Sequence, residues 1–335
     1  MKKGPDILKR IAGTLMLPAA MYIIMMIVCF ANGKTYYGTW AMWRTLFVSI
    51  AVSVSCAMGI GLQFKNGRFD FSGGAIMLVS AIIAGNVAKN NNNNLILFSL
   101  LCIGCCVILS VGVSLVYVYG RLPIMIATIG MALLYEAITS QIFGGGGINL
   151  VANMTLKKLS SYPYVFIPFV GAVITYAIFS YVSKAGKQGV LLSNNQSAAV
   201  NIGINENKNV IISYVFSGLI FGFATMIYAS TGIHSASYAS LSTVGELFTN
   251  ILPVFIGLYI GVFCGDTIGI MMGSVSICLM TFGLQAVLKA EMGSAVSTAL
   301  MGIFVFLVNL AAGQGANMKK AFSKMFTVHK GNAAA

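Results

Sequence analysis

Charged residues are scarce in this chain. Asp, Glu, Lys and Arg together make up 8% of its 335 residues, only seven residues are acidic, and 58% of the sequence is hydrophobic. A soluble domain of this length could not bury so much apolar surface while carrying so few charges. The composition therefore excludes a soluble globular protein and indicates an integral membrane protein.

Motifs for catalysis and metal binding are also lacking. The chain has no His-Glu-x-x-His, Gly-x-Ser-x-Gly or paired-Cys motif, and His234 and His329 lie far apart. Gly-Lys-Thr at 33–35 ends like a phosphate-binding loop, but Val28 occupies the position of the first glycine. We therefore expect a chain that is not an enzyme or an ATPase and that has no catalytic, cofactor or metal site.

Apolar runs of about 20 residues, the length that crosses a bilayer as a helix, recur along the chain. They do not alternate as barrel strands do, so the sequence predicts an all-α polytopic bundle of roughly ten transmembrane helices. The expected spans are about 11–31, 43–62, 75–87, one ending near 119, 124–143, one ending near 182, 210–230, 246–264, 267–288 and 294–312.

The formal charge of +13 comes from basic residues that stand singly in loops and tails. No aromatic residues are interleaved with them on one face, so the pattern favours the positive-inside rule over nucleic-acid binding. This rule places both termini in the cytoplasm. We expect a cytoplasmic segment 1–10, a membrane domain 11–312 with a cytoplasmic loop 183–208, and a basic cytoplasmic tail 313–335.

The polar interruption 183–208 also contains apolar residues that predict a short amphipathic helix after a polar lead-in. A loop that only joined two spans would not need an apolar face. Our working hypothesis is that the helix docks into a cytoplasmic partner that moves the spans. The alternative is an ordinary interfacial helix that lies on lipid.

Polar side chains inside apolar runs are candidates for lining a transport path. Asp70 and Ser72 either cap the next helix or line the path. Glu136 either faces the bundle interior or is a protonated or Thr139-bonded packing residue. Any of these side chains could instead bond one helix to another. The candidate set is Asp70, Ser72, Glu136, Glu246, Thr249, Asn250, Gln285 and Asn309.

Five glycines repeat at four-residue spacing near the C-terminus, a small-xxx-small pattern that allows helix backbones to approach closely. They are Gly257, Gly261, Gly265, Gly269 and Gly273. Residues 251–288 form either one kinked helix or two helices split at Gly265. We expect two.

Four short motifs follow one another in a specific order. They are Arg-Phe-Asp-Phe-Ser-Gly-Gly at 68–74, Leu-Pro-Ile-Met-Ile-Ala-Thr-Ile-Gly at 122–130, Ala-Ala-Val-Asn-Ile-Gly-Ile at 198–204 and Val-Gly-Glu-Leu at 244–247. With them the chain resembles the permease subunit of ribose-type bacterial ABC importers over about residues 45–312. Arg68 departs from the family, which has a glycine there, and Gln196-Ser197 replaces an acidic residue.

The resemblance implies that loop 183–208 holds the coupling helix, which fits a groove on a partner ATPase that binds ATP and Mg. It also implies a second permease chain, identical or different, and an extracytoplasmic solute-binding protein. The implied coupling residues are Asn194, Asn195, Ser197, Ala198, Ala199, Gly203 and Ile204.

These features predict a multi-pass permease of the bacterial cytoplasmic membrane that translocates a small polar solute. A monosaccharide of the ribose or galactose type ranks first and a nucleoside second. An ATP-independent secondary transporter or channel, and a scaffold subunit without solute flux, are the alternatives from other classes.

Overall fold

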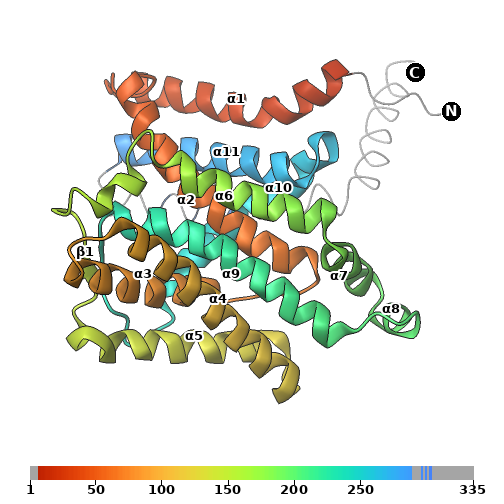
Figure 1. Cartoon of the computed structure of the whole chain (residues 1–335). Coiled ribbons are helices and arrows are strands. Elements are labelled where there is room, and N and C mark those ends of the chain that lie inside the picture. Colours follow the sequence, from red (N-terminus) through yellow and green to blue (C-terminus); the bar gives the residue numbers. More distant parts are fainter. Residues whose placement is uncertain (1–6, 289–295, 297–298, 300–301, 304–335) are drawn as a thin grey trace, which may run out of the picture.

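The computed structural model describes residues 7–288, 296, 299, 302 and 303, with Leu8 and Glu246 described without their side chains. This part of the chain is a bundle of α-helices (Figure 1). It contains eight helices that are long and apolar enough to cross a membrane, or nine if the bent pair 166–182 and 184–194 is one span. The all-α prediction is confirmed, and nearly all of the expected tenth span, 294–312, lies outside the described residues.

The long helices match the expected spans closely. They are α1 (Ile7–Ala31), α2 (Trp40–Lys65), α3 (Gly73–Asn90), α4 (Leu95–Gly120), α5 (Ile124–Gln141), α9 (Glu206–Thr231), α10 (Ser242–Cys264) and α11 (Asp266–Val287). The shorter α6 (Phe166–Ala177) covers the first part of the span expected to end near 182. The shorter elements are η1 (Ile142–Gly145), β1 (Ile148–Asn149), η2 (Leu156–Ser160), η3 (Ile178–Val182), α7 (Lys184–Asn194), α8 (Gln196–Asn201) and β2 (Ile233–His234).

Short polar side chains start several of these helices. Asn94 accepts the amides of Ile96 and Leu97 at the start of α4, at 3.0 and 3.1 Å. Asn205 accepts the amide of Lys208 at 3.0 Å at the start of α9. Such caps satisfy amides that have no partner within the helix. The sequence analysis did not identify them, and α9 begins at Glu206 rather than near 210.

Helix α9 runs through the centre of the bundle, where it packs against α2, α3, α4 and α6. Helices α10 and α11 form a hairpin that packs against α2, and α1 covers the outer side of α11 (Figure 1). Helix α5 lies at the opposite edge, against α3 and α4. This arrangement brings α2, α3, α9 and α10 together in the interior.

The glycine repeat lies in the α10–α11 hairpin. A Cβ atom on Gly269 would lie 2.2 Å from the carbonyl oxygen of Gly257, and one on Gly273 would lie 2.5 Å from that of Pro253. The chain breaks between the two helices at Gly265, whose φ of +88° favours glycine. The structure thus has two closely packed helices in this region, as expected.

The two ends of the bundle carry different elements. Helices α7 and α8 project from one end, and β1 lies at the other (Figure 1). Strands β1 and β2 pair antiparallel, with Ile148 opposite His234. They are the only strands among the described residues, and the sequence analysis did not expect them. They join the connection after α5 to the connection after α9.

Candidate functional site

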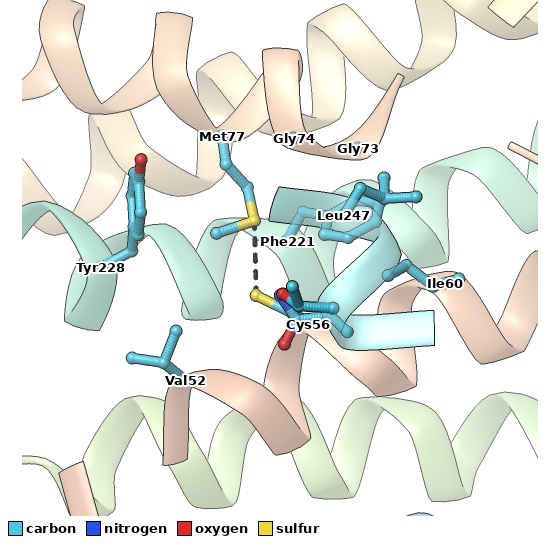
Figure 2. A pocket seen from close by; sticks show the side chains of 11 residues that line it. Val52, Cys56, Ile60, Gly73, Gly74, Met77, Phe221, Tyr228 and Leu247 are labelled. Carbon is cyan, nitrogen blue, oxygen red and sulfur yellow. Dashed lines mark hydrogen bonds between the residues drawn. The ribbon is translucent and has the colours of Figure 1, made fainter. Parts of the chain in front are cut away.

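Residues of α2, α3, α9 and α10 line a partly open cavity of about 220 Å³ (Figure 2). Its volume is below the ~300–1,000 Å³ of pockets that hold drug-sized ligands, so it suits a small solute. Its lining comprises Val52, Cys56 and Ile60 from α2, Gly73, Gly74 and Met77 from α3, Phe221 and Tyr228 from α9, and Leu247, Thr249 and Asn250 from α10.

Glycines on α2 and α3 make room for one aromatic wall of the cavity. A Cβ atom on either Gly59 or Gly73 would lie 2.6 Å from the Phe221 ring. The ring is therefore held between two helices, and Phe221 is 3% exposed. The sulfur atoms of Cys56 and Met77 lie 3.6 Å apart and connect α2 to α3 (Figure 2).

The cavity combines apolar walls with a few polar groups. Phe221 and Tyr228 contribute aromatic rings, and Thr249 and Asn250 contribute a hydroxyl and a carboxamide. None of the lining side chains that the structure describes is charged. Since a buried charge without a partner costs several kcal/mol, this lining suits a neutral solute that carries hydroxyl groups.

Glu136 does not line this cavity. It is 0% exposed, and its Oε2 atom accepts the Leu241 amide at 2.8 Å. Its Oε1 atom accepts the amide and the hydroxyl of Thr243, at 2.9 and 2.6 Å. Both oxygens act as acceptors, the pattern of an ionised carboxylate. The Thr139 hydroxyl donates to the backbone carbonyl of Glu136 rather than to its carboxylate. Glu136 thus faces the interior of the bundle, as one of the two expectations had it, but it does not line this cavity, and its carboxylate accepts amides at the start of α10.

Asp70 and Ser72 lie in the buried connection between α2 and α3, and neither lines the cavity. Asp70 Oδ1 accepts the amide and the hydroxyl of Ser72, at 2.8 and 2.6 Å. Burial raises the pKa of Asp70, and these hydrogen bonds oppose the rise. Ser72 is at the N-cap position of α3 but makes no side-chain bond to that helix. The pair therefore fixes the turn that leads into Gly73 and Gly74.

The other candidate path residues have different locations. Thr249 and Asn250 line the cavity. Gln285 is exposed on α11 and does not line it. Glu246 belongs to α10, but its side chain lies outside the described part of the structure, as does Asn309. The sequence analysis thus found two polar lining residues and missed the aromatic and glycine wall, because Gly and Phe in an apolar run look like ordinary packing residues.

Arg68 is a buried residue that the predicted site did not include. It is 5% exposed and donates to Ser213 Oγ at 2.9 Å and to Asn209 Oδ1 at 3.1 Å. Asn209 donates in turn to the carbonyl oxygen of Ala185 at 2.7 Å. These contacts connect α7, the start of α9 and the turn that precedes Gly73 of the cavity.

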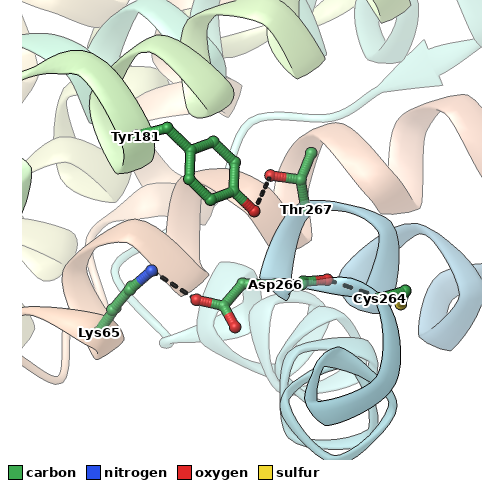
Figure 3. A network of polar contacts seen from close by, with 6 residues as sticks. Lys65, Tyr181, Cys264, Asp266 and Thr267 are labelled. Atoms are coloured by element: carbon green, nitrogen blue, oxygen red, sulfur yellow. Dashed lines mark hydrogen bonds and ion pairs between the residues drawn. The ribbon is translucent and has the colours of Figure 1, made fainter. Parts of the chain in front are cut away.

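A second polar network joins the end of α2 to the α10–α11 hairpin (Figure 3). Lys65 forms an ion pair with Asp266, the first residue of α11. The Thr267 hydroxyl donates to the Tyr181 hydroxyl at 3.2 Å, and Tyr181 belongs to η3, directly before α7. The segment that leads into α7 is therefore connected to the hairpin.

The expected amphipathic coupling helix is two helices, α7 and α8, joined at Asn195. The Asn195 side chain accepts the Ala198 amide at 3.0 Å and so starts α8. Leu192, Ala199 and Ile204 form a small apolar cluster of their own. Ala199 and Ile204, expected to contact an ATPase, therefore point inward.

The outer surface of this segment is partly apolar. Val200 is 46% exposed and Ile202 is 73% exposed, although neither was among the predicted coupling residues. The predicted coupling residues that are exposed are Asn194, Asn195, Ser197, Ala198 and Gly203. The end of the bundle that carries α7 and α8 thus presents polar and apolar side chains together (Figure 1).

Comparisons with known proteins agree with this architecture. A family model described as branched-chain amino acid transport system / permease component matches residues 42–306. The chain is 23% identical over 279 residues to the fructose import permease protein FruG of Bifidobacterium longum (strain NCC 2705), covering 78% of this chain and 79% of that protein. It is 23% identical over 190 residues to the autoinducer 2 import system permease protein LsrC of Enterobacter sp. (strain 638), covering 55% of each. No solved structure matches the chain significantly.

Proposed function

The chain belongs to the family of branched-chain amino acid transport system permease components, and from this premise we propose that it is the permease subunit of an ABC importer for a monosaccharide-type solute. The observation that carries the proposal is the cavity between α2, α3, α9 and α10, with aromatic rings, a hydroxyl and a carboxamide in its lining. A relative whose name specifies fructose import supports the same solute class.

The charge of the lining favours a sugar over an amino acid. A free amino acid carries an ammonium and a carboxylate, and each needs a partner when water is excluded. The described lining side chains provide no charged partner for either group. A monosaccharide needs only hydrogen bonds and apolar contact, which Asn250, Thr249 and the two aromatic rings supply. A nucleoside is the second candidate, because its base would stack on Phe221 or Tyr228.

We infer that the energy for transport comes from a partner ATPase that binds ATP and Mg and docks on α7 and α8. Closure of that partner would move α7, and the contacts of Asn209 with Ala185 and with Arg68 would transmit the movement to the turn before Gly73. The cavity would then open alternately to one side of the membrane and to the other. A second permease chain, a solute-binding protein on the far side, and a location in the bacterial cytoplasmic membrane complete the proposal.

The test is uptake in cells that express the chain together with candidate ATPase and solute-binding proteins from the same genome. Labelled fructose, ribose and galactose are compared with uridine and leucine. We expect monosaccharide uptake that is lost when the ATPase cannot hydrolyse ATP. Uptake by the chain alone would identify a channel or secondary transporter. Uptake of uridine alone would favour the nucleoside alternative, and uptake of leucine alone would refute the argument from cavity charge.

A further inference from the structure

The start of α10 lacks the usual side-chain cap. Leu241 precedes the helix in the left-handed region, with φ +57°, and makes no side-chain hydrogen bond to it. The first amides of a helix have no acceptor within the helix, and when buried they need one from elsewhere. Thr243, in this first turn, is 4% exposed.

Helix α5 supplies the missing acceptors. The Glu136 carboxylate accepts the Leu241 amide and both donors of Thr243. Three residues further along α5, the Thr139 hydroxyl accepts the Ser237 amide at 2.8 Å. Residues at this spacing lie on one face of a helix, so one face of α5 holds the chain from Ser237 to Thr243.

Thr243, whose amide and hydroxyl donate to Glu136, also contacts the wall of the cavity. A Cβ atom on Gly74, a lining residue, would lie 2.5 Å from the carbonyl oxygen of Thr243. Leu247, Thr249 and Asn250 line the cavity from the next turns of α10. A shift of the first turn of this helix would therefore move its polar lining groups relative to α3.

We propose that Glu136 is a positioning residue for solute binding, because its carboxylate sets the register of α10 and thereby the places of Thr249 and Asn250 in the cavity. The proposal rests on the proposed function of the cavity as the solute site. Glu136 does not contact the solute, and α5 contributes no residue to the lining.

Three variants separate positioning from folding. Glu136→Gln keeps the shape of the side chain but replaces one acceptor with a donor group that faces amide donors. Thr243→Val removes one donor of the same contact. Thr128→Val is the matched control, because Thr128 is buried on α5 and its hydroxyl donates only within that helix, to Met125 O at 3.2 Å.

The first readout is the kinetics of monosaccharide uptake. Because loss of the Leu241 and Thr243 contacts would displace Thr249 and Asn250, we expect Glu136→Gln to raise the apparent KM roughly ten-fold, with little change in Vmax per folded permease. Thr243→Val should raise KM less, and Thr128→Val should leave it unchanged. An unchanged KM in both Glu136→Gln and Thr243→Val would overturn the proposal. If Glu136→Gln fails to fold, the apparent KM of Thr243→Val alone decides whether the proposal stands.

The second readout does not require transport. It uses a chain in which Cys56 is the only cysteine, and it follows the reaction of this cavity-lining thiol with a small thiol reagent in membranes. We expect Glu136→Gln and Thr243→Val to change the reaction rate several-fold and Thr128→Val to leave it as it is. If no solute is taken up by any variant, the proposed function fails while this rate still tests the contact. Equal rates in all folded variants would refute the positioning role.

Discussion

At the scale of single residues, three acidic side chains of the described chain are engaged in structural contacts. Glu136 accepts amides at the start of α10, Asp70 accepts both donors of Ser72, and Asp266 pairs with Lys65. Their charges are therefore compensated or hydrogen-bonded away from the cavity, whose described lining is neutral. This distribution of charge is the basis of our proposal that the solute is neutral, since a charged solute would find no partner among the described lining side chains.

The polar lining residues give the first prediction. Asn250→Ala and Thr249→Val each remove hydrogen-bonding groups that a sugar hydroxyl would use, so each should raise the apparent KM for uptake roughly three- to ten-fold, the equivalent of about 1 kcal/mol. Thr175→Val is the control, because Thr175 lies on α6 and donates to Gly171 O within that helix. Kinetics unaltered in both cavity variants would argue against this cavity as the solute site.

His234 gives a pH-dependent prediction. Its ring centroid lies 3.9 Å from that of Tyr228, its Nε2 atom lies 2.7 Å from the Tyr228 carbonyl oxygen, and burial lowers its pKa below the usual 6.5. The unfolded chain therefore binds more protons than the folded chain as the pH falls through about 6.5, so stability present at neutral pH is lost on acidification. The Tm in detergent should fall more for the wild type than for His234→Asn between about pH 7.5 and 5.5. Parallel Tm curves would contradict the assignment.

At the scale of elements, the α10–α11 hairpin depends on the absence of side chains at its crossing. Gly269→Ala would place a methyl group 2.2 Å from the carbonyl oxygen of Gly257, so the helices must separate. We expect a loss of roughly 1–3 kcal/mol of stability, measured as thermal unfolding in detergent. Gly130→Ala on α5 is the control, since no atom lies within 4 Å of its Cβ position, and it should stabilise the helix slightly. Equal behaviour of the two variants would refute this packing argument.

The elements could largely be predicted from the sequence, because helix length and capping are local properties. The apolar runs predicted most helix boundaries to within a few residues, although the sequence analysis did not identify Asn94 and Asn205 as caps and expected α9 to begin near 210. The division of the segment 183–208 into the two helices α7 and α8 was not predicted. It depends on the Asn195 cap and on the small cluster of Leu192, Ala199 and Ile204, which exists only after the chain has turned.

At the scale of the whole molecule, the site was predicted in part. Thr249 and Asn250 stood out because polar residues in an apolar run are costly to bury. The capping role of Glu136 could not be predicted, because its partners are about one hundred residues away and are backbone amides. The wall formed by Phe221 between Gly59 and Gly73 likewise requires three helices to be placed in space.

The outer surface of α7 and α8, where we propose that the ATPase docks, gives a prediction at this scale. Ile202→Glu places a charge on an apolar residue that is 73% exposed and directly follows α8, so it should reduce both co-purification of the ATPase and ATP-dependent uptake without loss of folded permease. Val151→Glu is the control, because Val151 is 48% exposed and directly follows β1, at the other end of the bundle. Retention of the ATPase by Ile202→Glu would exclude this surface as the docking site.

We propose that the solute passes through the cavity between α2, α3, α9 and α10, and Cys56 in the wall of this cavity provides the test. In the chain whose only cysteine is Cys56, uptake is measured before and after complete modification by a membrane-permeant thiol reagent, with and without excess monosaccharide. We expect that modification of Cys56 abolishes uptake and that the monosaccharide slows this modification. Full uptake after complete modification, without protection by the sugar, would contradict it.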